Sequence, residues 1–241
     1  VEDLTSNKYD MEGLVQFENL LSEKNKLHGI QIIKSCVIEK MFPKSGAKVP
    51  EIRFKGFEGN WECKSASELF TAFVDKGHPE LPVLSATQDA GMVVRDGIGK
   101  SVFHDRANEV GYKRVMPGQF VIHLRSFQGG FAHSSIEGIT SPAYTVFGFK
   151  EPERHNDYYW KYVLTSKQFI KRLETVTYGI RDGRSISYEE FLTLNFVFPS
   201  KEEQTKICTF LRYLDTILSL RQQELDKLQS IKKALLEKMF V

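Results

Sequence analysis

A repeated helix end constrains the fold of this chain more than any other feature of its sequence. Residues 32–42 read IIKSCVIEKMF and residues 230–240 read SIKKALLEKMF, with six of eleven positions identical at an offset of 198 residues. The two copies bracket a globular insert. We therefore expect a module held on a long helical frame, rather than an enzyme built on one core.

The first helix of this frame is expected at residues 10–42, where apolar side chains recur at steps of three and four. Pro43 ends the pattern, and PKSGAKVP follows with the composition of a linker. We accordingly expect an N-terminal frame helix at 1–43, a linker at 44–60, a recognition domain at 61–199 and a C-terminal frame helix at 200–241.

The second frame helix is expected at residues 202–240. Ser200 is a suitable N-cap, because Glu203 follows it at the capping-box spacing. The apolar seam of this helix is interrupted by Arg221 and Lys232, but it largely alternates steps of four and three, as coiled coils do. At about 1.5 Å per residue the helix is roughly 58 Å long. Such a helix needs a partner helix along its length.

The insert has the pattern of a mixed domain with a strand-rich core. Short apolar runs between Gly, Pro and Asp turns predict strands at 81–86, 91–94, 100–103, 112–115, 119–124, 144–149 and 194–198. Helical stretches are expected at 65–73, 157–164, 166–175 and 187–194. The predicted fold class is therefore α+β, with a strand-rich domain and long helices.

Composition narrows the choice of partner only slightly. The net charge is +2, and residues 51–200 hold eighteen basic and eighteen acidic side chains, so a basic patch must arise from sorting in three dimensions. No apolar run is long enough to predict a membrane span, and the polar, acidic start is unlike a signal peptide. The missing initiator Met indicates a trimmed chain or a part of a longer one. Three scattered cysteines favour a reducing cytoplasm over a disulfide framework or a zinc site.

The sequence offers no catalytic constellation. The segment GIGKS at 97–101 resembles the end of a P-loop, but the preceding glycine of that motif is replaced by Val at position 94. The glycine-rich cofactor loop and the aromatic motif of a nucleic-acid methyltransferase are both missing. Asp89, Asp96, Asp105 and Glu109 occupy turn-like places, whereas a nuclease needs carboxylates on adjoining strands. The four histidines between 78 and 133 fit no metal-binding spacing.

Residues 111–134, GYKRVMPGQFVIHLRSFQGGFAHS, are the best candidate for recognition of a ligand. Their Arg, Lys, Gln and Ser side chains can read base edges or grip phosphates, and two glycines at 129 and 130 would let the loop approach a partner closely. An ordinary polar hairpin is the alternative. Loops at 74–82 and 178–187 add further cationic side chains. The candidate DNA-contacting residues are Lys76, His78, Gln88, Arg95, Lys113, Arg114, Arg125, Ser126, Gln128, Arg181 and Arg184.

Taken in order, several segments resemble the specificity subunit of type I restriction–modification systems. They are IEKMFPKSGAKVPEIRFKGFEGNW at 38–61, LSATQDAGMVVRD at 84–96, PGQFVIHLRSFQGGFAHSSIEGITSPAYTVF at 117–147, GIRDGRSISYEEF at 179–191, FPSKEEQTKI at 198–207 and LLEKMF at 235–240. The resemblance covers almost the whole chain. The first helix departs from it, because LTSNKY at 4–9 stands where the second helix has EEQTKI.

The resemblance implies a target recognition domain that reads one half of a split target in double-stranded DNA, with flanking helices that form an antiparallel coiled coil. It implies a non-catalytic subunit without a cofactor of its own. Its helices would bind modification (methyltransferase) subunits, which carry S-adenosylmethionine, and a restriction subunit would complete the nuclease complex. Full subunits of the family carry two recognition domains and this chain carries one. We therefore expect a half-subunit or a C-terminal half, which could self-associate as a dimer and read a palindromic split target.

Three other interpretations follow from the same residues. The chain could be the specificity portion of a restriction enzyme whose methylase and nuclease are fused elsewhere in one polypeptide. It could be a coiled-coil scaffold whose near-neutral insert binds protein, which strong, salt-dependent DNA binding would exclude. An enzyme in its own right is the third, and no constellation of residues supports it.

Overall fold

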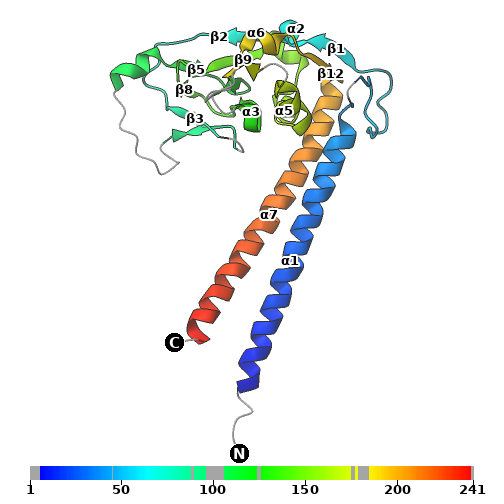
Figure 1. Cartoon of the computed structure of the whole chain (residues 1–241), viewed down its shortest axis with the longest axis vertical. Coiled ribbons are helices and arrows are strands. Elements are labelled where there is room, and N and C mark those ends of the chain that lie inside the picture. The colour runs from blue at the N-terminus through cyan, green and yellow to red at the C-terminus, as the bar shows by residue number, and fades with distance from the viewer. Residues whose placement is uncertain are drawn as a thin grey trace, which may run out of the picture. The chain divides into compact units, whose positions relative to one another are not determined.

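The computed structural model describes residues 6–44, 46–87, 90–95, 106–123, 126–174, 177–178 and 185–239. Contacts divide the chain into two compact units. The helical unit comprises Val1–Phe57 and Thr209–Val241, and the strand-rich unit comprises Glu58–Cys208. The mixture of helix and strand confirms the α+β prediction (Figure 1).

The helical unit is an antiparallel pair made by α1 (Ser6–Met41) and the part of α7 (Lys201–Met239) that begins at Thr209. Lys34 forms an ion pair with Asp215, and Leu27 and Leu225 are buried against each other with Leu218 and Leu228 packed beside them. Along α1 the contacts therefore move toward the N-terminus as they move toward the C-terminus of α7, which is the antiparallel register (Figure 1).

The sequence repeat has a structural counterpart in this pair. Leu27 and Leu225 are separated by the same 198 positions as the repeated helix ends, and they pack on each other. Glu23 and Arg221 are also 198 positions apart, and their charged groups lie 3.5 Å from each other. Positions that are equivalent in the repeat therefore meet one another near the middle of the pair. This places an approximate two-fold axis of the helical unit between these two contacts.

The strand-rich unit contains five small antiparallel sheets among the described residues. The largest has the order β2-β9-β6-β7, and the others pair β1 with β12, β3 with β4, β5 with β8, and β10 with β11. Their bounds are β1 Glu62–Ser65, β2 Phe70–Phe73, β3 Leu84–Ala86, β4 Met92–Val94, β5 Lys113–Val115, β6 Phe120–Ile122, β7 Ala132–His133, β8 Gly138–Thr140, β9 Thr145–Phe149, β10 Thr177–Tyr178, β11 Ser185–Ile186 and β12 Asn195–Phe198.

Short helices complete this unit, and side-chain caps fix where three of them begin. The side chains of Asn156, Ser166 and Ser187 each accept a hydrogen bond from a backbone N–H in the first turn of the helix that follows. The helices are α2 Ala66–Leu69, α3 Ser126–Gly129, α4 Asp157–Leu164, α5 Lys167–Leu173 and α6 Tyr188–Leu192, with 3-10 turns at Arg106–Gly111 and Pro152–Arg154.

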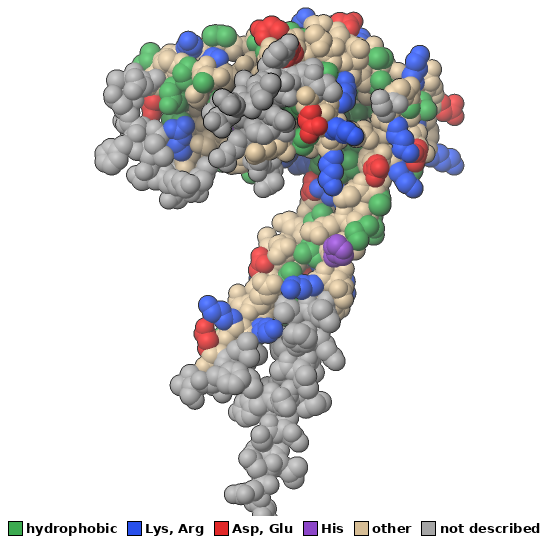
Figure 2. All heavy atoms as spheres, viewed as in Figure 1, with side chains coloured by type: hydrophobic (Ala, Val, Ile, Leu, Met, Phe, Trp, Pro, Cys, Tyr) green, Lys and Arg blue, Asp and Glu red, His purple; other side chains and the backbone are tan. Residues whose placement is uncertain are grey.

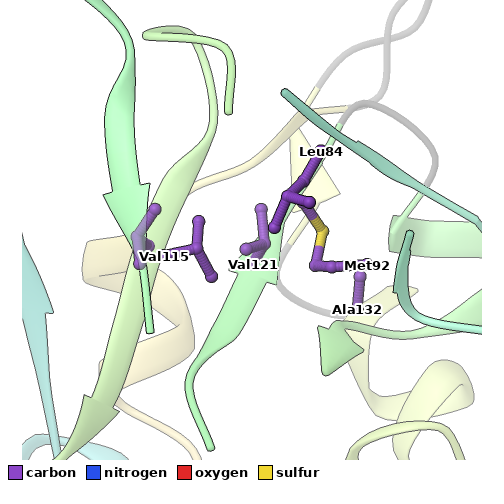
Figure 3. Packing of buried hydrophobic residues seen from close by; sticks show 6 residues of the cluster. Leu84, Met92, Val115, Val121 and Ala132 are labelled. Carbon is purple, nitrogen blue, oxygen red and sulfur yellow. The ribbon is translucent and has the colours of Figure 1, made fainter. Parts of the chain in front are cut away.

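Two groups of buried side chains form the core of the strand-rich unit. The aliphatic group joins the small sheets and consists of Leu84, Met92, Val115, Val121, Ala132 and Val146 (Figure 3). The aromatic group lies around Phe70, whose ring is 5.4 Å from that of Phe147 and 5.4 Å from that of Trp160. Edge-to-face pairs of this kind stabilise a core beyond the area that they bury. These two groups hold the surface elements that carry the polar candidates.

Several element predictions are wrong in detail. The stretch predicted as one helix at 65–73 is α2 followed by β2, because Phe70–Phe73 pairs with β9. The strands β1, β7, β8, β10 and β11 were not predicted. The helix predicted at 157–164 is confirmed as α4, and the strand predicted at 100–103 lies outside the described residues. None of the helices in the described part of the chain has the length and apolar character of a membrane span.

Candidate nucleic-acid interface

Four of the predicted contact residues lie on one connected set of strands. Lys76 bridges to Lys113 of β5, β5 pairs with β8, and Ile139 of β8 bridges to Val83 at the start of β3. Arg114 also lies on β5, and Arg95 directly follows β4, the partner of β3. Residues far apart in the sequence, at 76, 95 and 113–114, are thus brought onto one connected network of strands.

Strand alternation separates Lys113 from Arg114. Successive side chains on a strand point to opposite faces, so Lys113 shares its face with the buried Val115 and Arg114 points the other way. The Lys113 amine donates a hydrogen bond of 2.6 Å to the carbonyl oxygen of Tyr144. Burial lowers the pKa of Lys113, and the nearby charge of Lys76 lowers it further. Lys113 therefore supports the local fold, and Arg114 is the one that faces the polar surface.

Arg114 is held by two carboxylates. Its guanidinium forms an ion pair with Glu137 and another with Asp75 at 3.3 Å. The hydrogen bond that Arg114 donates to Glu137 is the main cause that raises the pKa of Arg114. The arrangement fixes the direction of the guanidinium, and a phosphate would have to compete with both carboxylates for it.

His78 and Lys76 belong to the same polar cluster. The His78 ring lies 2.9 Å from Asp75 and 3.5 Å from Glu80. A hydrogen bond from His78 is the largest cause that lowers the pKa of Asp75. Lys76 is exposed. The cluster thus combines Asp75, Glu80 and Glu137 with His78, Lys76 and Arg114. On the face drawn in Figure 2, acidic and basic side chains are likewise interspersed over the strand-rich unit.

Arg95 and Gln128 are placed on two further surfaces. The Arg95 Nε donates a hydrogen bond of 3.2 Å to the Ser85 hydroxyl across the β3–β4 pair. Gln128 is exposed on α3, which packs against α5 and against β11. The helix that carries Gln128 therefore contacts β11, which belongs to the segment 178–187 that was also selected from the sequence.

Ser126 has a structural role in the folded chain, and its contact with DNA stays a prediction. Its side chain is buried, and its hydroxyl accepts a hydrogen bond of 2.8 Å from the backbone N–H of His123. Gly130 also has a structural role. Its φ is +81°, and a Cβ there would lie 2.1 Å from the carbonyl oxygen of Leu164. The close approach expected of this loop is made to the end of α4.

The remaining candidates, Gln88, Arg125, Arg181 and Arg184, lie outside the described residues. Within the described ranges no group of three or more His, Cys, Asp or Glu side chains is arranged to hold a metal ion. One polar pair among the described residues has a structural role. The ring of buried His133 lies 2.7 Å from the Asp157 carboxylate and so joins β7 to the start of α4. Burial opposes ionisation of Asp157, yet the hydrogen bond and the charge of His133 together lower its pKa.

Sequence reasoning missed the cationic surface of α5. This helix contains Lys167, Lys171 and Arg172 and has no acidic residue. The signal was present in KQFIKRL, a short helix with three cations, but a stretch predicted only for its helical pattern drew no attention to its charge.

Solved structures resemble this chain over nearly its full length. The HsdS subunit from Thermoanaerobacter tengcongensis aligns with a TM-score of 0.62 and 16% identity, over 97% of this chain and 56% of that one. A second chain, from work on complex assembly and conformational transition of the type I R-M system, aligns with a TM-score of 0.62 and 15% identity, over 97% of this chain and 57% of that one. No protein-family model and no curated protein sequence matches the chain.

These likenesses define the class of fold: it is that of type I restriction–modification specificity subunits. The family resemblance predicted from the sequence is thereby confirmed at the level of the fold. The chain spans a little over half the length of the two solved chains.

Proposed function

We propose that the chain is a DNA sequence-specificity subunit of a type I restriction–modification complex. The strand-rich unit would recognise one half of a split DNA target, and the helical unit would dock the modification subunits. The observation that carries this proposal is the fold match over 97% of the chain, which includes both the strand-rich unit and the two long helices. Methyl transfer would be performed by the partner modification subunit, which binds S-adenosylmethionine.

An apolar stripe on the helical unit supports the docking role. On α7, Tyr213 and Leu220 are 63% and 56% exposed, and Ile217 lies between them on the same face. On α1, Ile33 is 56% exposed beside Ile30 and Val37, which follow helical spacing. Helical geometry puts both stripes on the side of the pair where Glu23 and Arg221 meet. Exposed apolar surface of this kind marks an interaction site.

The single strand-rich unit of this chain supports a proposal of self-association. The chain carries one strand-rich unit and spans about half of each solved relative, so a two-part target would need a second recognition unit. Two copies related by a two-fold axis would supply it and would read a palindromic split motif. Where a second, different chain supplies the other unit, the motif would be asymmetric.

The test is co-expression of the chain with its modification subunit, followed by mapping of methylated adenines in host DNA. Methylation at one split motif is the expected result, and a palindromic motif would indicate two copies of this chain. If a stable complex forms and no motif is methylated, the specificity role is wrong for this chain on its own. A catalytically inactive modification subunit is the control for background methylation.

A further inference from the structure

We propose that the exposed face of α5, formed by Lys167, Gln168 and Lys171, binds the phosphate backbone of DNA. The inference rests on the proposed function and adds to it a site outside the residues selected from the sequence. It concerns positioning on DNA and not base readout, because lysine amines and a helical amide can grip phosphates of any sequence.

The core fixes α5 rigidly behind this face. Phe169 and Leu173 are buried, and the Phe169 ring lies 5.1 Å from Phe131 and 5.9 Å from Phe196. Ser166 caps the helix by accepting a hydrogen bond from the Phe169 N–H. Since both ends of the buried face are anchored, the opposite face has a fixed direction, which a phosphate-binding surface requires.

Arg172 belongs to the packed side of the helix. Its guanidinium lies 5.2 Å from the centre of the Phe196 ring and donates a hydrogen bond of 2.5 Å to the carbonyl oxygen of Asn195. Burial lowers its pKa. The cations of α5 are thus divided between a structural arginine and two exposed lysines.

The two lysines form a like-charge pair that the described chain does not neutralise. Lys167 and Lys171 are four positions apart and therefore neighbours on one face, an arrangement that destabilises a helix. Among the residues that the structure describes, no carboxylate lies within 4 Å of either amine. Glu174 follows the helix as its C-cap and is the nearest acidic residue in sequence. An external polyanion would relieve this repulsion.

Four other cations of the strand-rich unit do have partners for their charged groups. Arg114 and Arg154 are each paired with two carboxylates. The amines of Lys150 and Lys201 donate to the backbone carbonyl oxygens of Ser67 and Glu153. The lysines of α5 are exposed instead, on a helix that packs against α3 and its exposed Gln128 (Figure 1).

The test compares two doubly substituted chains in the complex with the modification subunit. Lys167→Gln with Lys171→Gln removes the proposed contacts. Lys150→Gln with Lys201→Gln removes the same charge from the same unit. Binding is measured by fluorescence anisotropy on a duplex that carries the mapped motif and on a scrambled duplex, across a series of salt concentrations.

We expect the α5 variant to lose roughly tenfold in affinity at about 0.1 M salt, equally on both duplexes. Its slope of log affinity against log salt should fall by nearly two, because each phosphate contact contributes about 0.9. The control variant should keep most of the wild-type slope. Lys167→Arg with Lys171→Arg should restore both quantities, which would show that the charge and not the fold was lost.

Two results would overturn the inference while the proposed function stands. In one, the complex methylates its motif and the α5 variant keeps the wild-type affinity and slope. In the other, the loss is confined to the motif duplex, which would mean base readout. If the wild-type complex showed neither motif methylation nor salt-dependent binding, the proposed function and this inference would both be overturned.

Discussion

At the residue scale, His155 is a buried histidine whose surroundings change its protonation. It is 8% exposed, and its ring stacks on Phe149 with centroids 4.5 Å apart and planes 22° from parallel. Burial, with added repulsion from Arg154 and Lys64, lowers its pKa from 6.5 to about 4. His155 is therefore mostly neutral in the folded chain above about pH 5.

The pH dependence of folding follows from this shift. Between pH 6.5 and 4 the unfolded chain binds a proton at position 155 that the folded chain does not bind. The free energy of unfolding contributed by His155 is thus complete above pH 6.5 and is lost as the pH falls toward 4, by at most about 3 kcal/mol. We expect His155→Phe to flatten this decline in urea titrations followed by Trp fluorescence. Parallel pH profiles for the variant and for wild type would contradict this, and His28→Gln on exposed α1 is the control.

Gly130 gives a second prediction at this scale. A side chain there meets both a left-handed backbone and the Leu164 carbonyl oxygen at 2.1 Å. We expect Gly130→Ala to reduce the free energy of unfolding by more than about 2 kcal/mol. Gly59 has a similar φ of +77° with no atom within 4 Å of the added Cβ, so Gly59→Ala should cost only about 1 kcal/mol. Equal costs, measured by urea denaturation, would show that the contact with α4 is unimportant.

At the scale of elements, the exposed stripe of α7 can be separated from the stability of the helix. Tyr213→Ser with Leu220→Ser should leave the free energy of unfolding within about 0.5 kcal/mol of wild type, because both side chains are exposed in the isolated chain. The same variant should fail to co-purify with the modification subunit in size-exclusion chromatography with light scattering. Gln222→Ser with Gln229→Ser, also exposed on α7, is the matched control. Normal assembly of the apolar variant would refute the docking role of this stripe.

Elements with a cap and a regular period were predictable from the sequence. The bounds of α4 were predicted correctly, and in the structure Asn156 caps this helix, whose buried face recurs at helical spacing. The run FTAF at 70–73 was assigned to a helix because its identity as a strand depends on pairing with β9, a partner more than seventy positions away. The strands β7 and β8 are two and three residues long, which is too short for any period to show.

The candidate site was predictable only in part, for a related reason. Sequence position joined Lys113 to Arg114, but strand alternation puts them on opposite faces. Ser126 looked polar and accessible in the sequence, and only the fold shows that its hydroxyl satisfies a backbone group. The bridge between Lys76 and Lys113, in contrast, places two independently chosen residues side by side.

At the scale of the whole molecule, the repeated helix ends and the approximate two-fold axis both reflect the similarity of α1 to α7. The repeat makes α1 and α7 similar in sequence, and the axis places Leu27 against its equivalent, Leu225. A contact between equivalent residues is compatible with pairing of α1 and α7 and equally with pairing of two identical helices. The contact between Leu27 and Leu225 therefore stabilises the helical unit but does not favour the mixed pair over a pair of identical helices.

The ion pair between Glu23 and Arg221, next to this leucine contact, does favour the mixed pair of α1 and α7 over a pair of identical helices. We expect Glu23→Arg or Arg221→Glu alone to lower the melting temperature of the helical unit, and the double exchange to recover part of the loss. The exchange re-forms the pair between the helices in the opposite sense, but it also breaks the pairs that Glu23 makes with Lys26 and Arg221 makes with Glu224 within their own helices. Circular dichroism during thermal unfolding measures this. A double variant as unstable as the singles would show that the attraction between the two charges is unimportant.

The approximate axis is thus broken by charge at its centre. Two α1 helices paired in this register would place Glu23 against Glu23, and two α7 helices would place Arg221 against Arg221, whereas the mixed pair joins opposite charges. The helical unit therefore carries a charge code that distinguishes α1 from α7: Glu23 of α1 pairs with Arg221 of α7, and Lys34 of α1 pairs with Asp215 of α7. Such a code favours closure of each chain on itself over exchange of helices between chains, and so leaves the outer apolar surface free for assembly.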